Sequence, residues 1–228
     1  MIKVTENLWK IQDLLRAEAV AAGRVPESVK LLAVSKRKPV EAILEAAAAG
    51  QRDFGENFAQ EGIDKIEGAG RDDLTWHFIG HLQSNKTRLV AEHYDWVHTI
   101  DRIKVARRLS QQRPHHAGDL NVCIQVNIDD EQGKAGIRPE DVESMAREVA
   151  ALPKLKLRGL MCIPAMRSGM DAQRKPFAAL RCLLESLQQD GLELDTLSMG
   201  MSADYPAAIR EGATIVRIGT LLFGERDG

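Results

Sequence analysis

Two basic residues of this chain occupy positions from which they could do chemistry together. Lys36 closely follows the apolar run 29–34, and Arg217 lies within a second apolar run, 214–218, near the other end of the sequence. A deprotonated lysine amine attacks carbonyl carbons, and an arginine donates hydrogen bonds without accepting any. If the two runs form neighbouring strands, both side chains can serve a single small ligand.

Two short segments suit a phosphate group. Gly219-Thr220 follows the last apolar run, and Met201-Ser202 stands at the end of the run before it. Glycine lets the backbone approach an anion, and hydroxyl and free amide groups can satisfy its oxygens. Ordinary capping of strand ends is the competing explanation. Lysine, arginine and phosphate loop together are the groups needed to hold pyridoxal phosphate as a Schiff base.

Each basic residue also has a simpler role. Lys36 belongs to a Lys-Arg-Lys turn and could be an ordinary solvated lysine. A Schiff-base lysine needs a pKa well below the free value of ~10.4, which burial and Arg217 would both favour. Arg217 could instead be a buried arginine that bridges carbonyls or a carboxylate. As a ligand contact it would donate to an unprotonated pyridine nitrogen, which leaves the ring a weaker electron sink.

Asn57 and two histidines complete the polar candidates. Asn57 falls at the end of the second strand candidate, where it could hydrogen-bond the ligand's ring hydroxyl or cap the next helix. His77 and His81 have a spacing that suggests a metal, but no third ligand is evident. We therefore expect no metal and assign both histidines to the polar groups of the site's mouth.

Short apolar runs alternate with helical segments, which is typical of βα units around a parallel sheet. The strand candidates are 29–34, 53–56, 76–79, 96–99, 122–128, 155–163, 196–201 and 214–218. After a leading helix with an apolar face from Leu8 to Ala22, helices are expected at 39–49, 57–67, 85–93, 101–112, 139–151, about 171–189 and 204–211. Asp101 is placed to cap one helix, and Pro176 suggests where the regular part of another begins.

This order predicts an α/β fold, a single (β/α)8 TIM-type barrel with an extra N-terminal helix, as one domain over residues 1–228. In a closed barrel the first and last strands are neighbours, so Lys36 and Arg217 would meet across one seam. An open doubly wound sheet is the alternative. Its glycine-rich nucleotide signature, Gly-x-Gly-x-x-Gly, is absent, and so is Gly-x-x-x-x-Gly-Lys.

Composition argues against several classes of protein. Apolar residues make up 44% and charged residues 28%, with a net charge of −2, so no overall field favours nucleic acid or an anionic membrane. No run approaches the ~18 apolar residues of a membrane span, and no secretion signal is evident. The three cysteines have no Cys-x-x-Cys spacing, which predicts reduced thiols in a cytoplasmic protein.

Five segments, taken in order, resemble the pyridoxal phosphate homeostasis protein family. They are Leu32-Ala33-Val34-Ser35-Lys36, Phe54-Gly55-Glu56-Asn57, Trp76-His77-Phe78-Ile79-Gly80, Leu197-Ser198-Met199-Gly200-Met201-Ser202 and Val216-Arg217-Ile218-Gly219-Thr220. The resemblance implies a barrel like the N-terminal domain of alanine racemase and a role in vitamin B6 and amino-acid homeostasis. It implies pyridoxal 5'-phosphate contacts from Lys36 (the Schiff base), Asn57, His77, Ser198, Met201, Ser202, Arg217 (the pyridine), Gly219 and Thr220.

Alanine racemases add a C-terminal β domain that supplies a tyrosine base and part of a dimer interface. Thr220 is followed by only eight residues, so we expect no such domain, a monomer, and no residue in a catalytic role. Stereoinversion needs a base on each face of the substrate. The expectation is a protein that buffers or delivers the cofactor, with small amino acids and apo forms of pyridoxal phosphate enzymes as candidate partners. A pyridoxal-dependent enzyme such as a weak amino-acid racemase, and a barrel for another phosphorylated metabolite, are the alternatives.

Overall fold

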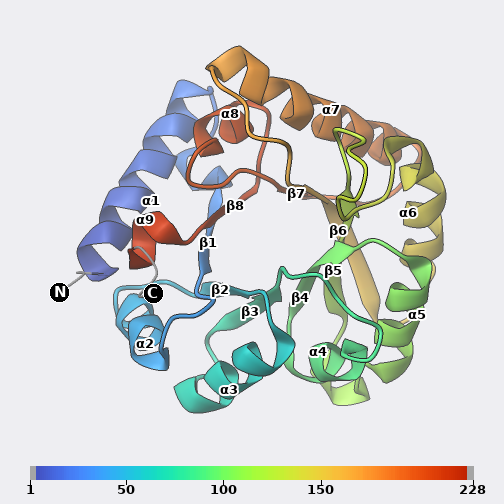
Figure 1. The fold of residues 1–228 in the computed structure, drawn as a ribbon, viewed down its shortest axis with the longest axis horizontal. Helices are drawn as coiled ribbons and strands as arrows, with labels where there is room; N and C mark the ends of the chain where they lie inside the picture. Colours follow the sequence, from blue (N-terminus) through green and yellow to red (C-terminus); the bar gives the residue numbers. More distant parts are fainter. Residues whose placement is uncertain (1–3, 225–228) are drawn as a thin grey trace.

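Eight parallel strands form one closed barrel in sequence order, as the computed structural model shows for the residues it describes, 4–224. The strands are β1 (Lys30–Val34), β2 (Asp53–Glu56), β3 (Thr75–Phe78), β4 (Trp96–Ile100), β5 (Leu120–Val126), β6 (Leu155–Cys162), β7 (Thr196–Ser198) and β8 (Ile215–Ile218). Figure 1 looks down this ring, with the helices arranged around its outside. The predicted (β/α)8 barrel is confirmed, and the open doubly wound sheet is excluded.

The helices lie between the strands as a TIM-type barrel requires. They are α1 (Val4–Ala21), α2 (Val40–Ala48), α3 (Ala59–Ala69), α4 (Thr87–His93), α5 (Ile103–Gln112), α6 (Val142–Ala150), α7 (Met170–Gln189), α8 (Tyr205–Arg210) and α9 (Thr220–Phe223). Short 3₁₀ turns occur at η1 (Pro26–Ser28), η2 (His115–Ala117) and η3 (Pro139–Asp141). Among these, no helix is both long and apolar enough to cross a bilayer.

The seam between β1 and β8 closes the barrel and positions the two basic residues. Leu32 is the register partner of Arg217, and Ala33 is the partner of Ile218. Side chains alternate along a strand, so Leu32 and Arg217 face the same side of the sheet. The expectation that Arg217 lies beside the strand that leads to Lys36 is therefore confirmed.

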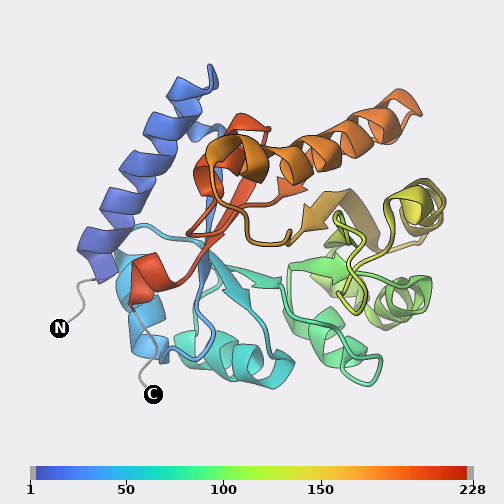
Figure 2. The same cartoon turned by 45° about the horizontal axis from the view of Figure 1, so that its top comes forward.

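The extra N-terminal helix covers the outside of this seam. Helix α1 buries one face, formed by Val4, Leu8, Ile11, Leu15 and Ala19. It runs beside α9, and the Asn7 side-chain amide donates a hydrogen bond to the Leu222 carbonyl at 3.1 Å (Figure 2). The beginning and the end of the described chain thus support the same side of the barrel.

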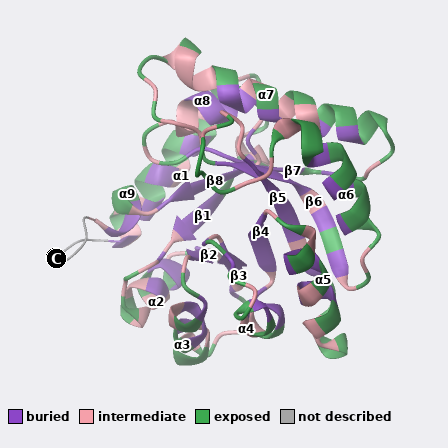
Figure 3. Cartoon of the chain, turned by 45° about the vertical axis from the view of Figure 1, so that its right-hand side comes forward, coloured by how far each residue is buried: buried purple, intermediate pink, exposed green. Residues whose placement is uncertain are grey.

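Apolar packing lies mainly between the strands and the helices, whereas the barrel interior is partly polar. Figure 3 shows buried strands at the centre and exposed outer faces on the surrounding helices. Inside the barrel, Trp96 packs with Cys123 and Met161 in a small separate cluster, and it stacks on His77 with ring centroids 5.3 Å apart. The barrel interior therefore combines apolar packing with buried polar side chains.

Three local expectations were wrong, each for a physical reason. The strand predicted over 196–201 ends at Ser198, because Gly200 has a φ of +93° and an added Cβ there would lie 2.6 Å from Ala208. Helix α7 spans Met170–Gln189, close to the predicted 171–189, but its regular part does not begin at Pro176, which is a buried residue inside the helix. Asp101 does not cap α5; its carboxylate accepts a hydrogen bond from the neighbouring Arg102 Nε at 2.9 Å.

Candidate functional site

A cavity of about 300 Å³ opens at the carboxyl ends of the strands and gathers most of the predicted site. It is lined by seven of the nine predicted residues, namely Lys36, Asn57, Met201, Ser202, Arg217, Gly219 and Thr220. Its charged lining residues, Lys36 and Arg217, are both basic, which favours an anionic ligand. An adjacent hollow of about 440 Å³, beside His81 and Lys86, shares only Asn57 with this set.

A buried ion pair anchors the turn that carries Lys36. The Ser35 hydroxyl donates to Glu56 Oε1 at 2.6 Å, and Lys65 Nζ donates to the Ser35 carbonyl at 2.7 Å. Lys65 Nζ also donates to Glu56 Oε1 at 2.9 Å, so lysine and glutamate hold both the side chain and the backbone of Ser35. Because Ser35 directly precedes Lys36, this pair fixes where the Lys36 side chain starts.

The other side of the same turn is held by Glu61. Its carboxylate accepts hydrogen bonds from the Arg37 backbone N–H and from Lys65 Nζ, the latter at 2.6 Å. Arg37 has a φ of +59°, a conformation that non-glycine residues adopt only when their surroundings enforce it. Burial raises the pKa of Glu56, and the hydrogen bonds from Ser35 and Lys65 oppose that rise.

Asn57 offers the cavity an acceptor that the protein does not use. Its side-chain oxygen, Oδ1, is buried and has no hydrogen-bond partner among the described residues. The N-cap of α3 is Phe58, without a side-chain cap bond, so helix capping does not occupy Asn57. Gly80 packs so closely that an added Cβ would lie 1.9 Å from the Asn57 carbonyl oxygen. A buried acceptor without a partner is costly, and a ligand hydroxyl could satisfy it.

The loop after β7 places Ser202 at the cavity. The Met201 backbone N–H donates to Asp204 Oδ1 at 2.7 Å, and the Tyr205 N–H donates to the Met201 carbonyl at 2.9 Å. Burial raises the pKa of Asp204, and the hydrogen bond from Met201 opposes that rise. Across the cavity, an added Cβ at Gly219 would lie 3.2 Å from the Val34 carbonyl, so a larger residue there would crowd β1.

Arg217 is buried, and its guanidinium is held by neighbouring strands. Nη1 donates to the Ser198 carbonyl at 2.7 Å and to the Ser198 hydroxyl at 2.9 Å, and Nη2 donates to the Cys162 carbonyl at 2.9 Å. Burial lowers the pKa of Arg217. The side chain bridges carbonyls, as the simpler interpretation expected, and it also lines the cavity.

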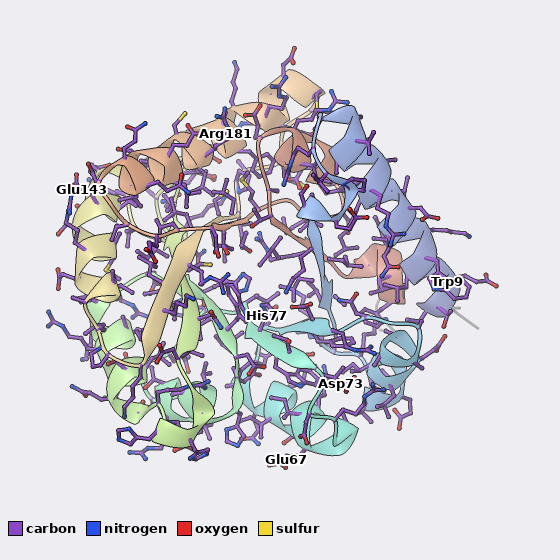
Figure 4. All side chains as sticks on the ribbon, turned by 180° about the vertical axis from the view of Figure 1, so that it is seen from behind. Trp9, Glu67, Asp73, His77, Glu143 and Arg181 are labelled. Carbon is purple, nitrogen blue, oxygen red and sulfur yellow. The ribbon has the colours of Figure 1, made fainter. Side chains whose placement is uncertain are left out.

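Two predicted residues, His77 and Ser198, lie deeper than the cavity and do not line it. Both are fully buried, and Figure 4 shows His77 near the centre of the barrel, while Trp9, Glu143 and Arg181 lie on its outer surface. His77 Nε2 and Asp53 Oδ1 are 3.0 Å apart. His81, the other histidine considered as a metal ligand, is exposed, and its Nδ1 lies 3.7 Å from Asp101 Oδ2. Over residues 4–224, no three His, Cys, Asp or Glu side chains gather as a metal site would need.

Sequence reasoning missed several residues that support the site. Glu56 ends a buried strand, and a charge at such a position is a usable signal, whereas Lys65 lies among charged residues of α3 and gives no such signal. His98 lies two residues after Trp96 in the same strand, so both side chains face the same side of the sheet. The inward orientation of His98 was therefore predictable from the sequence. The protein's two tyrosines, Tyr94 and Tyr205, do not line the cavity.

The sequence is similar to known proteins over almost the whole chain. The family model described as alanine racemase, N-terminal domain, matches residues 13–227. A Pseudomonas aeruginosa protein named pyridoxal phosphate homeostasis protein is 55% identical over 227 residues, covering 100% of this chain and 97% of that protein. An Escherichia coli protein of the same name is 51% identical over 230 residues, covering 100% and 98%.

Solved structures agree with the fold. PipY of Synechococcus elongatus, in a structure with PLP bound, is 42% identical with a TM-score of 0.80, and the match covers 92% of this chain and 100% of that one. An alanine racemase of Clostridium difficile in complex with cycloserine has a TM-score of 0.75 at 15% identity, covering 98% of this chain and 60% of that one. At that identity the likeness concerns the fold alone.

Proposed function

Because the chain belongs to the pyridoxal phosphate homeostasis protein family, we propose that it binds pyridoxal 5'-phosphate as a Schiff base on Lys36 and serves the homeostasis of this cofactor and of amino acids. The observation that carries the proposal is one cavity that combines Lys36, Arg217 and the unpartnered Asn57 oxygen. The cofactor supplies an aldehyde, a hydroxylated pyridine ring and a phosphate, and each has a matching group here.

Each residue then has a defined task. The Lys36 nitrogen bonds to the aldehyde carbon, and the carbonyl oxygen leaves as water. Arg217 donates to the ring nitrogen, and Asn57 Oδ1 accepts from the ring hydroxyl. Ser202 and Gly219-Thr220 hold the phosphate, with Met201 beside them. Arginine has no proton to give at ordinary pH, so the ring nitrogen stays unprotonated.

The cavity also supports binding without turnover. Among the described residues that line it, Lys36 is the only candidate base, because the other lining side chains are apolar, amide, hydroxyl or guanidinium groups. A single base serves one face of an amino acid, so inversion lacks its second proton donor. We therefore infer a protein that holds the cofactor without turning over a substrate. We further propose that it is monomeric and cytoplasmic, with small amino acids and apo enzymes as its partners.

Uptake, delivery and turnover can be measured in one series. Wild type, Lys36→Ala and the control Lys86→Ala, which alters the adjacent hollow, are incubated with pyridoxal phosphate and freed of excess. The loaded protein is then offered to an apo enzyme, and separately to L-alanine in deuterated water. We expect uptake by wild type and Lys86→Ala only, reactivation of the apo enzyme, and no deuterium at the α carbon.

Two results would overturn parts of this proposal. Deuterium incorporation or D-alanine would make the protein a weak racemase. Absence of uptake by wild type would leave a barrel for another phosphorylated metabolite.

A further inference from the structure

A line of polar side chains, buried except for the half-buried Asp53 at its end, crosses the barrel interior beneath the cavity. Its members, called the buried relay below, are Asp53, His77, His98, Ser198 and Arg217. Arg217 Nη1 lies 2.9 Å from Ser198 Oγ, Ser198 Oγ lies 2.8 Å from His98 Nδ1, His98 Nε2 lies 2.9 Å from His77 Nδ1, and His77 Nε2 lies 3.0 Å from Asp53 Oδ1. Arg217 and Ser198 come from β8 and β7, and His98, His77 and Asp53 come from β4, β3 and β2, so the bond between Ser198 and His98 crosses the barrel.

If both imidazoles are neutral, the two ends of the buried relay fix the direction of every hydrogen bond in it. A guanidinium can only donate and an ionised carboxylate can only accept. Ser198 Oγ therefore accepts a hydrogen bond from Arg217, and the Ser198 hydroxyl donates a hydrogen bond to His98 Nδ1. His98 Nε2–H then donates to His77 Nδ1, and His77 Nε2–H donates to Asp53. Both neutral imidazoles then carry their proton on Nε2.

Burial supports this neutral state. His77 and His98 are both fully buried, and burial lowers the pKa of each, that of His98 well below its usual value. A protonated His77 would donate to His98 Nε2, so that His98 would carry its proton on Nδ1. Arg217 and His98 would then both donate to the Ser198 oxygen, and the Ser198 hydroxyl proton would have no acceptor in the relay. Burial would raise the pKa of Asp53, but the hydrogen bonds from His77 and Lys30 and the charge of Lys30 hold it below its usual value.

The buried guanidinium of Arg217 donates its hydrogen bonds to neutral oxygens among the described residues. None of the hydrogen bonds of its guanidinium goes to a carboxylate among residues 4–224; its acceptors are the Ser198 carbonyl, the Ser198 hydroxyl and the Cys162 carbonyl. These three bonds leave about two of its five N–H groups, on Nε and Nη2, for a ligand. The carboxylate whose charge acts on Arg217 is that of Asp204, whereas Asp53, at the far end of the line, pairs with Lys30 Nζ at 2.8 Å.

We propose that Asp53, His77, His98 and Ser198 are positioning residues that orient Arg217 toward the ring nitrogen of pyridoxal phosphate. The proposal rests on the function proposed above. The hydrogen bonds of the relay run from Arg217 toward Asp53, so the relay fixes the guanidinium in place, leaves its Nε–H and one Nη2–H for the ligand, and delivers no proton to the ring. His77 and Ser198 then serve the cofactor through Arg217 rather than by touching it.

The proton order is testable without any cofactor. Long-range proton–nitrogen NMR spectra of the full ¹⁵N-labelled chain report the tautomer of each histidine, and His77→Gln and His98→Gln assign the two signals. We expect both rings neutral, protonated on Nε2, and without titration from about pH 5.5 to 8.5, a range that spans the free value of ~6.5. A proton on Nδ1 of either ring, or titration in this range, would overturn the order.

The positioning role needs a separate comparison. Ser198→Ala removes the hydroxyl link, and Ser110→Ala is its matched control, a buried serine whose hydroxyl donates only to the Pro153 carbonyl at 2.7 Å. We expect Ser198→Ala to weaken cofactor binding about tenfold and to shift the His98 Nδ1 signal, while Ser110→Ala changes affinity less than about twofold.

The outcomes are distinguishable. Unchanged affinity in Ser198→Ala, or equal losses in both variants, would overturn the positioning role. Absence of uptake by wild type would overturn the proposed function instead, and the NMR result would still decide the proton order.

Discussion

Replacing Lys65 with methionine should destabilise the protein by about 3–5 kcal/mol at about pH 8, because it leaves the Glu56 carboxylate buried without a counter-charge. Glu56 is fully buried, and the Lys65 side chain is 8% exposed. The three donors of the ammonium group bond to Glu56, the Ser35 carbonyl and Glu61 at 2.9, 2.7 and 2.6 Å. Methionine has a similar length but satisfies none of these acceptors.

The loss should depend on pH with a defined sign. Burial raises the pKa of Glu56 above its unfolded value, and losing Lys65 removes one of the groups that oppose this rise. Below the unfolded value of ~4.3 both states hold the proton, so the carboxylate adds no penalty there. As pH rises, the unfolded chain ionises first, so the deficit of Lys65→Met grows from about pH 4 toward pH 8.

Urea unfolding followed by circular dichroism at both pH values measures the deficit. Arg147→Met is the matched control, since it breaks exposed ion pairs with Glu143 and Asp190, each worth at most about 1 kcal/mol. The double variant Glu56→Gln/Lys65→Met should recover much of the stability, because no charge is left buried. A deficit below about 1 kcal/mol at pH 8 in Lys65→Met, or one independent of pH, would refute this reasoning.

Three further changes have defined outcomes. Asn57→Ala should weaken cofactor binding about tenfold in an absorbance titration while leaving the urea midpoint unchanged or higher, since it removes an unsatisfied buried acceptor; a lower midpoint with full affinity would contradict this. Gly80→Ala should lower both cofactor affinity and melting temperature, because its Cβ would lie 1.9 Å from the Asn57 carbonyl oxygen. Wild-type values for both would contradict this, because they would show that the backbone shifts to accept the methyl group without loss. Iodoacetamide at about pH 8 should label only Cys182 in the folded protein, as judged by mass, because thiolates are the reactive form. Burial raises the pKa of the Cys123 and Cys162 thiols to about 12, and two or three rapid labels would contradict their burial.

The sequence was sufficient for the barrel and for most of the cavity. Apolar runs located all eight strands, and β2 was predicted with its observed bounds, Asp53–Glu56. The carboxyl ends of strands share one mouth in a barrel, so residues at those ends can be grouped from the sequence alone. This rule brought Lys36, Asn57 and Arg217 together.

Packing against distant elements decided what the sequence left open. Lys65 lies in a helix with charged neighbours, and nothing local shows that it turns inward to Glu56. The bond between His98 and Ser198 joins residues 100 positions apart across the barrel, so it depends on the register of every strand between them. For the same reason, His77 and Ser198 were assigned direct contact with the cofactor, although the structure places both beneath the cavity.

Borohydride reduction followed by peptide mass mapping tests the central claim most directly. The protein is incubated with pyridoxal phosphate, reduced, digested and searched for the pyridoxyl mass on every lysine. We predict that the adduct lies on Lys36 and that Lys36→Ala acquires none there or elsewhere at the same cofactor concentration. An adduct on another lysine, or one equally abundant in Lys36→Ala, would contradict the assignment of this cavity as the cofactor site.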